Sequence, residues 1–156
     1  MKIRIITIGK TSASYLKEGI AIYLKRLDHY ANVEVVELSD VAAKGLSPQV
    51  LKEKEGELLL KTFKAGESVV LLDEKGNGYS SVQFSEVLQK KMNAGTKGIC
   101  FVVGGAFGFS QAVYDRAEMK LSFSKMTYSH EMIRLLLAEQ LYRAFTILKG
   151  ESYHHE

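Results

Sequence analysis

Apolar residues follow two alternating patterns along the chain: short runs rich in β-branched residues, and longer stretches with helical spacing. The short runs are typical of buried strands, and they occupy residues 2–9, 33–38, 68–72, 99–103 and 119–123. Apolar positions three or four residues apart predict helices, at residues 13–30, 47–63, 80–92, 110–117 and 129–149. Strands and helices therefore alternate through the whole chain, which predicts an α/β fold with a mostly parallel sheet.

Local signals mark where these elements begin and end. Ser47 precedes Pro48, so the serine can cap a helix whose first position tolerates the missing N–H of proline. The sequence Gly76-Asn77-Gly78 predicts a turn after the third strand. No internal repeat or linker rich in proline and glycine divides the chain, so residues 1–156 are expected to form a single domain.

Composition narrows the class of protein. The chain has 156 residues, of which 46% are hydrophobic and 25% charged, as in ordinary globular proteins. A net charge of +3 gives no strong electrostatic reason to expect nucleic-acid binding. The single cysteine, Cys100, lies in an apolar run and is expected in the core, without a disulfide or a thiolate metal site. No run reaches the ~18 apolar residues of a membrane span, and no signal peptide is recognised, so we expect a cytoplasmic protein.

Segments with small or polar residues follow three of the predicted strands. They are residues 72–76, 103–108 and 121–127. Ligands of parallel sheets bind outside the carboxyl ends of the strands, so these segments are expected to form a pocket. Gly104-Gly105-x-x-Gly108 has neither the spacing nor the position of a dinucleotide fingerprint. A structural turn and a backbone-lined site for another nucleotide-like ligand both stay open.

The helix expected at residues 129–149 carries two polar signals in an otherwise apolar segment. His130-Glu131-x-x-Arg134 has arginine where a zinc-binding HExxH motif needs histidine, so we expect no metal. Arg143 lies nine residues after Arg134 and thus on the opposite face of the helix. Because the helix is apolar almost all round, burial against a second chain is favoured, which predicts a dimer. Tyr153-His154-His155 follows this helix, either as an unstructured end or as a source of groups that titrate near neutral pH.

Four segments carry a resemblance to a known family: MKIRIITIGK, VVLLDEKGNGYSS, FVVGGAFG and LSFSKMTYSHEMIRLLLAEQLYRAFTILKGESYH. Together they resemble the RlmH (YbeA-like) family of SPOUT-class RNA methyltransferases. The resemblance covers nearly the whole chain, and LSFSKMT, EQLYRAF and the final YH are its most specific parts. It implies a SPOUT-type knotted α/β fold with a mostly parallel sheet of five to six strands. The last helix of such a fold passes through a loop and forms a C-terminal trefoil knot.

The resemblance also implies an activity and a cofactor site. Members of the family bind S-adenosylmethionine and work as homodimers, and they methylate N3 of a pseudouridine in the helix 69 loop of 23S rRNA on the assembled ribosome. No metal and no membrane are involved. The implied cofactor-binding residues are Leu72, Gly104, Gly105, Phe123, Ser124, Lys125, Met126, Thr127 and Tyr128.

A catalytic hypothesis follows from the chemistry of methyl transfer. The protonated N3 is a poor nucleophile, so its proton must be removed or its anion stabilised. We expect Tyr153 and His154, supplied near the cofactor pocket of the partner chain, to orient the base and assist deprotonation. Arg143 is expected to hold a phosphate or an oxygen of the base, and His130 is a further candidate. The rival hypothesis is a ribosome-binding or assembly factor without enzymatic activity.

Overall fold

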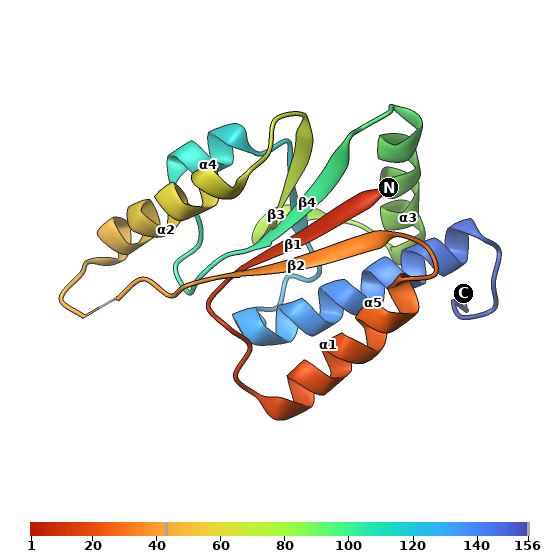
Figure 1. The fold of residues 1–156 in the computed structure, drawn as a ribbon, viewed down its shortest axis with the longest axis horizontal. Helices are drawn as coiled ribbons and strands as arrows, with labels where there is room; N and C mark the ends of the chain where they lie inside the picture. The colour runs from red at the N-terminus through yellow and green to blue at the C-terminus, as the bar shows by residue number, and fades with distance from the viewer. Residues whose placement is uncertain (43, 156) are drawn as a thin grey trace.

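Five parallel strands form the centre of the molecule, in the order β2-β1-β4-β3-β5 (Figure 1). The computed structural model describes residues 1–42 and 44–155. The strands are β1 (Lys2–Ile8), β2 (Asn32–Leu38), β3 (Glu67–Gly78), β4 (Gly98–Val103) and β5 (Met119–Ser122). The helices are α1 (Ser14–Leu27), α2 (Pro48–Thr62), α3 (Ser81–Asn93), α4 (Gln111–Arg116) and α5 (His130–Leu148).

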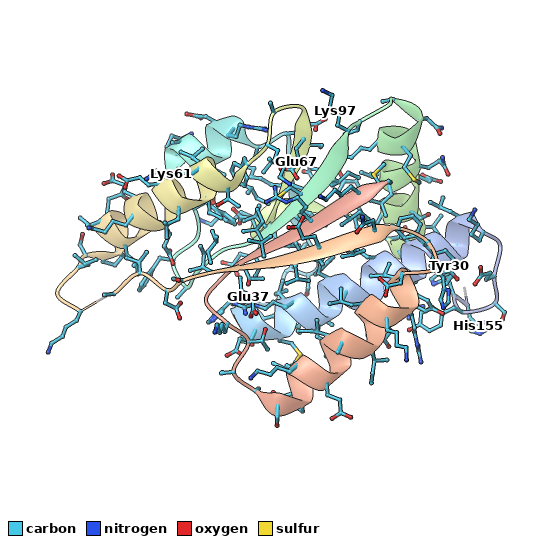
Figure 2. All side chains as sticks on the ribbon, viewed as in Figure 1. Tyr30, Glu37, Lys61, Glu67, Lys97 and His155 are labelled. Carbon is cyan, nitrogen blue, oxygen red and sulfur yellow. The ribbon has the colours of Figure 1, made fainter. Side chains whose placement is uncertain are left out.

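The sheet is covered on both faces, which explains why its strands read as continuous apolar runs. Helices α1, α3 and α5 pack on one face, and α2 and α4 pack on the other (Figure 1). Alternate residues of β1 point to opposite layers: Ile5 belongs to the core beneath α1 and α5, and Ile6 to the core beneath α2. Side chains fill both layers (Figure 2). Cys100 is fully buried, as the sequence predicts, and burial raises the pKa of its thiol to about 12.

The predicted element order and the α/β class are confirmed, and so is the cap of α2. The Ser47 hydroxyl accepts a hydrogen bond from the Val50 N–H at 3.2 Å, with Pro48 at the first helical position. The turn predicted at residues 76–78 is wrong, because these residues belong to β3. The strand leaves its ladder after Leu72 and pairs with β5 again at Asn77.

The glycine at position 76 explains that course of β3. A Cβ atom on Gly76 would lie 2.7 Å from the carbonyl carbon of Lys120, so only glycine lets β3 pass so close to the backbone of β5. The signal that suggested a turn is therefore a close approach between two strands.

Helix α5 is enclosed within the single chain. No residue between Glu131 and Leu148 is fully exposed, because the helix lies between α1, α3 and the sheet (Figure 1). Arg134 is buried and donates hydrogen bonds to the carbonyl oxygens of Ile8 and Gly9 and to the hydroxyl of Thr11. Arg143 lies on another face, as predicted. The apolar circumference of α5 is thus largely explained by packing inside one chain.

Candidate functional site

A cavity of about 490 Å³ lies at the carboxyl ends of β4 and β5, beside residues 72–75 of β3, where that strand leaves its ladder. Its volume falls within the range of roughly 300–1,000 Å³ that is typical of small-molecule sites. The three segments expected to converge here do so, and every residue of the implied cofactor set except Lys125 lines the cavity. Lys125 is exposed and does not line it.

The loop after β4 forms one wall and depends on two glycines. A Cβ atom on Gly104 would lie 2.8 Å from the ring of Phe109, and one on Gly105 would lie 2.5 Å from the carboxylate of Glu55. A larger residue at either position would push the loop away from its supports in α2 and in the core. The Gly108 N–H closes the loop by donating to the Gly105 carbonyl at 3.3 Å.

The loop after β5 forms the opposite wall, and side-chain hydrogen bonds fix its shape. The Ser124 hydroxyl accepts from the Met126 N–H at 2.9 Å, and the Ser122 hydroxyl donates to the Ser124 carbonyl at 2.9 Å. The Thr127 hydroxyl donates to the Glu74 carboxylate at 2.7 Å, which joins this loop to the one after Leu72.

Carboxylates give the cavity an acidic side. Asp73 accepts a hydrogen bond from the Tyr114 hydroxyl at 2.5 Å and another from the Lys75 N–H at 2.9 Å. Burial, together with the bond to Asp73, raises the pKa of Tyr114 to about 12, so this phenol stays protonated at neutral pH. Glu74 lies beside Asp73 on the same wall. The cavity can therefore attract a cationic group of a ligand.

The N-terminus of α5 contributes to the mouth of the cavity. Ser129 caps the helix by accepting from the Met132 N–H at 3.1 Å, and His130 and Ile133 line the cavity. Apolar side chains around the mouth are unusually exposed: Met126 is 74% accessible and Phe107 53%. His130, the weakest of the four catalytic candidates, is therefore the one that the structure brings to the cavity.

The other three catalytic candidates form a cluster at the opposite end of α5. The Tyr153 hydroxyl donates to the Glu139 carboxylate at 2.9 Å and lies 3.2 Å from the Tyr23 hydroxyl. Nη1 of Arg143 lies 3.2 Å from Nδ1 of His154, which acts as the acceptor because a guanidinium only donates. The Arg143 guanidinium also lies 4.7 Å from the centre of the Tyr153 ring. The C-terminal segment is therefore docked on its own chain.

Electrostatics define the protonation of this cluster. The hydrogen bonds that the Arg143 guanidinium donates to the Glu139 carboxylate raise the pKa of Arg143, which stays positive. Burial and the contacts with Tyr23 and Glu139 raise the pKa of Tyr153 above its usual value. A phenol in this state is a hydrogen-bond donor at neutral pH and not a base.

The cluster and the cavity lie far apart within one chain. Arg143 follows His130 by 13 residues of continuous helix, which corresponds to about 20 Å at 1.5 Å per residue. None of Arg143, Tyr153 and His154 lines the cavity. One chain by itself does not bring the implied cofactor residues and the C-terminal candidates to one site.

The cofactor-binding set implied by the resemblance leaves out several residues of the cavity. Asp73, Tyr114 and Ile133 line the cavity but are absent from that set. Asp73 does belong to the segment 72–76, which the sequence predicts at the pocket. Tyr114 and Ile133 come from helices, and their direction depends on how α4 and α5 pack against the sheet.

A parallel α/β sheet with a ligand-sized cavity at its carboxyl ends defines a cofactor- or nucleotide-binding α/β protein. Comparison with known families makes the class specific. The model of the family described as "Predicted SPOUT methyltransferase" matches residues 1–154, so the chain belongs to this methyltransferase family.

Curated relatives agree with this assignment over their full length. The chain is 54% identical to a protein of Parabacteroides distasonis, and the alignment covers 100% of both chains. It is 50% identical to a protein of Cytophaga hutchinsonii, over 99% of this chain and 100% of the relative. A protein of Flavobacterium johnsoniae is also 50% identical, with full coverage of both chains. Each of these relatives is named ribosomal RNA large subunit methyltransferase H.

Within residues 1–42 and 44–155, no helix combines the length and apolarity needed to cross a bilayer. In the same part of the chain, no group of three or more histidine, cysteine, aspartate or glutamate side chains is arranged to hold a metal ion.

Proposed function

We propose that this chain is an S-adenosylmethionine-dependent methyltransferase of large-subunit ribosomal RNA, acting on N3 of the pseudouridine in the helix 69 loop of 23S rRNA. The observation that carries the proposal is the cavity beside β3, β4 and β5, in a chain of the SPOUT methyltransferase family. The names of the full-length relatives support ribosomal RNA as the substrate.

The residues around the cavity fit the proposed cofactor. Backbone groups of the loops at Gly104 and at 123–128 can meet the edge of an adenine, and Leu72 and Phe123 offer apolar contacts to its faces. Asp73 and Glu74 supply negative charge for a ligand that carries a sulfonium and an ammonium group. When bound, S-adenosylmethionine supplies an electrophilic methyl group, and the role of the chain is to align the acceptor nitrogen with it.

The C-terminal cluster is proposed to prepare the acceptor. Arg143 stays positive and can stabilise negative charge on an oxygen of the base as N3 loses its proton. Tyr153, protonated at neutral pH, is assigned to orienting the base through its hydroxyl. Proton removal then belongs to His154, with His130 at the mouth of the cavity as the alternative.

A homodimer is part of the proposal, because the two groups of residues lie about 20 Å apart along α5. In a two-fold symmetric dimer with antiparallel α5 helices, the C-terminal end of one helix lies beside the N-terminal end of the other. Apolar surface for such an interface exists on α1, where Tyr15 is 65% and Ile22 47% accessible. These residues are seven positions apart and share a helix face.

Three finer points belong to the same proposal. The segment 123–129 passes the loop after Leu72, to which Thr127 is bonded, and the C-terminal trefoil knot is proposed there. A net charge of only +3 gives weak electrostatic attraction to RNA, which favours recognition of the shape of an assembled ribosome. Action on the ribosome implies that the protein works in the cytoplasm.

Calorimetric titration of the full chain with S-adenosylmethionine tests the cofactor site. We expect one binding event per chain, and we expect Ser124→Trp, which fills the cavity, to abolish it. Lys54→Trp, at an exposed position of α2, is the matched control and should bind as the unaltered chain does. Absence of binding by the unaltered chain would favour the non-enzymatic ribosome-binding factor. Methylation itself is read by mass spectrometry of helix 69 after incubating large subunits from cells that lack the protein.

A further inference from the structure

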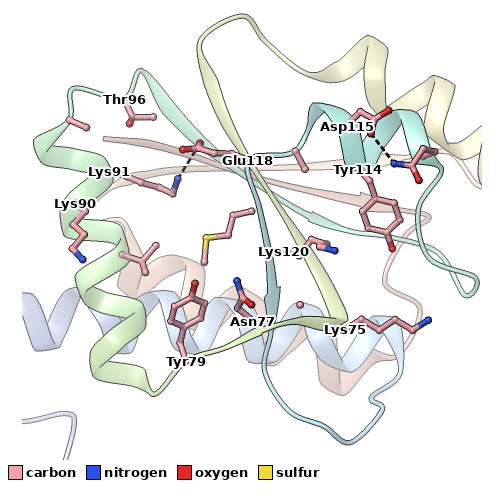
Figure 3. Close-up of a pocket in the computed structure, with 16 residues that line it drawn as sticks. Lys75, Asn77, Tyr79, Lys90, Lys91, Thr96, Tyr114, Asp115, Glu118 and Lys120 are labelled. Carbon is pink, nitrogen blue, oxygen red and sulfur yellow. Dashed lines mark hydrogen bonds and ion pairs between the residues drawn. The ribbon is translucent and has the colours of Figure 1, made fainter.

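A second, larger cavity lies on the outer side of β5, the edge strand of the sheet, between α3 and α4 (Figure 3). Its volume is about 780 Å³. We call it the lysine groove, defined by Lys75, Lys90, Lys91 and Lys120 together with Asn77, Tyr79, Thr96, Tyr114, Asp115 and Glu118. It adjoins the cofactor cavity, because Lys75 and Tyr114 line both.

The charges of the groove are unbalanced. Lys91 is the lysine that is already occupied: it lies 3.2 Å from the Glu118 carboxylate and 2.7 Å from the Ser68 hydroxyl. Glu118 also accepts a hydrogen bond from the Ser68 hydroxyl through the same oxygen, Oε2. The other acid, Asp115, accepts from Gln111 of its own helix at 2.8 Å.

Three lysines of the groove remain available. Lys75, Lys90 and Lys120 are exposed, and within residues 1–42 and 44–155 none of them forms an ion pair. Their ammonium groups come from three separate elements: the loop within β3, the last turn of α3 and the strand β5. The ammonium of Lys120 lies 5.4 Å from the centre of the ring of Tyr114, a residue that lines both the groove and the cofactor cavity. Such an arrangement suits an extended polyanion and not one compact anion.

We propose that the lysine groove binds the RNA strand that flanks the target nucleotide, through its phosphates. This inference rests on the proposed rRNA methyltransferase function. Lysine ammonium groups recognise phosphate oxygens and set the position of a nucleic acid without reading its sequence. A strand whose target base enters the cofactor cavity can continue past Lys75 and Tyr114 into the groove. Positioning at this second surface compensates for the low net charge of the chain.

The test uses Lys90→Ala/Lys120→Ala, because neither lysine lines the cofactor cavity. We expect KM for large ribosomal subunits to rise several-fold. The slope of log(kcat/KM) against log salt concentration should become shallower by about 1.4, at about 0.7 per lost phosphate contact on a single strand. Lys90→Arg/Lys120→Arg should restore both quantities. The matched control is Lys54→Ala/Lys61→Ala on α2, a helix that contributes no residue to the groove. Both lysines are exposed, and Lys61 is labelled in Figure 2. This control should change neither quantity.

Two measurements separate failure of this inference from failure of the proposed function. Calorimetry with S-adenosylmethionine and methylation by the unaltered chain test the proposed function, and neither measurement uses a variant of the groove. Fluorescence anisotropy with a protein-free RNA hairpin of helix 69 at low salt tests RNA as the occupant. We expect weaker binding by Lys90→Ala/Lys120→Ala. Unchanged KM and salt slope would overturn the proposal. A defect on intact subunits with unchanged hairpin binding would also overturn it and would indicate an acidic ribosomal protein instead.

Discussion

Glu55 is a buried carboxyl group behind the wall of the cofactor cavity. It is only 6% accessible, and its Oε1 atom has no hydrogen-bond partner among the described residues. Its carboxylate packs against Gly105 of the loop that forms one side of the cavity. Burial, reinforced by the charge of Asp40, raises the pKa of Glu55. The loop of the cavity therefore rests on a carboxyl group that holds its proton more strongly in the folded protein than in the unfolded chain.

A pH-dependent stability follows from that shift. Below the ordinary pKa of glutamate, about 4.3, Glu55 is protonated in both the folded and the unfolded protein, so no charge is buried on folding. As the pH rises from there towards the raised folded value, only the unfolded chain releases the proton, so the folded state loses stability. Glu55→Gln carries no such charge. We therefore expect Glu55→Gln to raise the melting temperature more at pH 8 than at pH 5. The gain at pH 8 should correspond to roughly 1–3 kcal/mol in the free energy of unfolding.

The control for this measurement lies two residues further along the same helix. Glu57 is exposed, so Glu57→Gln should show the same melting difference at both pH values. If Glu55→Gln behaved like Glu57→Gln, the carboxyl group of Glu55 would be solvated or paired in solution. The support that we assign to the loop at Gly105 would then have to come from elsewhere.

At the scale of elements, one buried ion pair ties strands and a helix together on the side of the sheet covered by α2. Arg4 of β1 and Glu67 at the start of β3 are both buried, with nitrogen and oxygen 2.9 Å apart, and β4 lies between the two strands. The same guanidinium donates to the carbonyl oxygen of Thr62, the last residue of α2. The pair therefore fixes the end of α2 against the sheet.

Removing one partner of this pair should be costly. We expect Glu67→Gln to lower the free energy of unfolding by about 3–5 kcal/mol, because the charge of Arg4 would remain buried without compensation. Urea denaturation measures the change. Glu34→Gln is the matched control: Glu34 lies 3.7 Å from Nε of the same arginine but is partly exposed to solvent, so this substitution should cost much less than Glu67→Gln. Equal effects of the two substitutions would contradict the buried pair.

The accuracy of the sequence prediction differed between kinds of element for physical reasons. Strands such as β4 were readable because both faces are buried, so every residue from Gly98 to Val103 is apolar or small. Helix starts were readable because capping is local chemistry, as at Ser47. The second half of β3 was not readable, since its pairing depends on the approach of Gly76 to Lys120 in another strand. The same holds for Tyr114 and Ile133 in the cavity, whose directions are set by packing between distant segments.

At the scale of the whole molecule, the two halves of the candidate site belong to opposite ends of α5. Many of the cavity residues were predictable because they lie in segments that follow predicted strands. No sequence pattern, however, indicates whether Tyr153 and His154 of the same chain or of a second chain lie near the cavity. Within one chain they do not, and the C-terminal segment is docked on its own helix through Glu139 and Tyr142. In the two-fold dimer that we propose, a site composed from two chains would bring both groups of residues together.

Complementation between two inactive chains tests that arrangement. One chain carries Ser124→Trp in the cavity, and the other carries Tyr153→Ala/His154→Ala. The two are co-expressed with different affinity tags, so that only mixed dimers are purified. In each mixed dimer, one composite site combines the intact cavity of one chain with the intact C-terminal residues of the other. We expect about half of the unaltered activity on large ribosomal subunits, since one site of two is complete.

The decisive comparison is a dimer of an unaltered chain with a chain that carries all three substitutions. If sites are composed from two chains, each site of this dimer contains one defective part, and it should be inactive although one chain is intact. If each chain completes its own site, the outcomes reverse: this dimer keeps about half of the activity, and the first mixed dimer has none. Both dimers carry the same set of substitutions, divided differently between the two chains. The opposite order of the two activities in the two cases therefore reports where the C-terminal residues act.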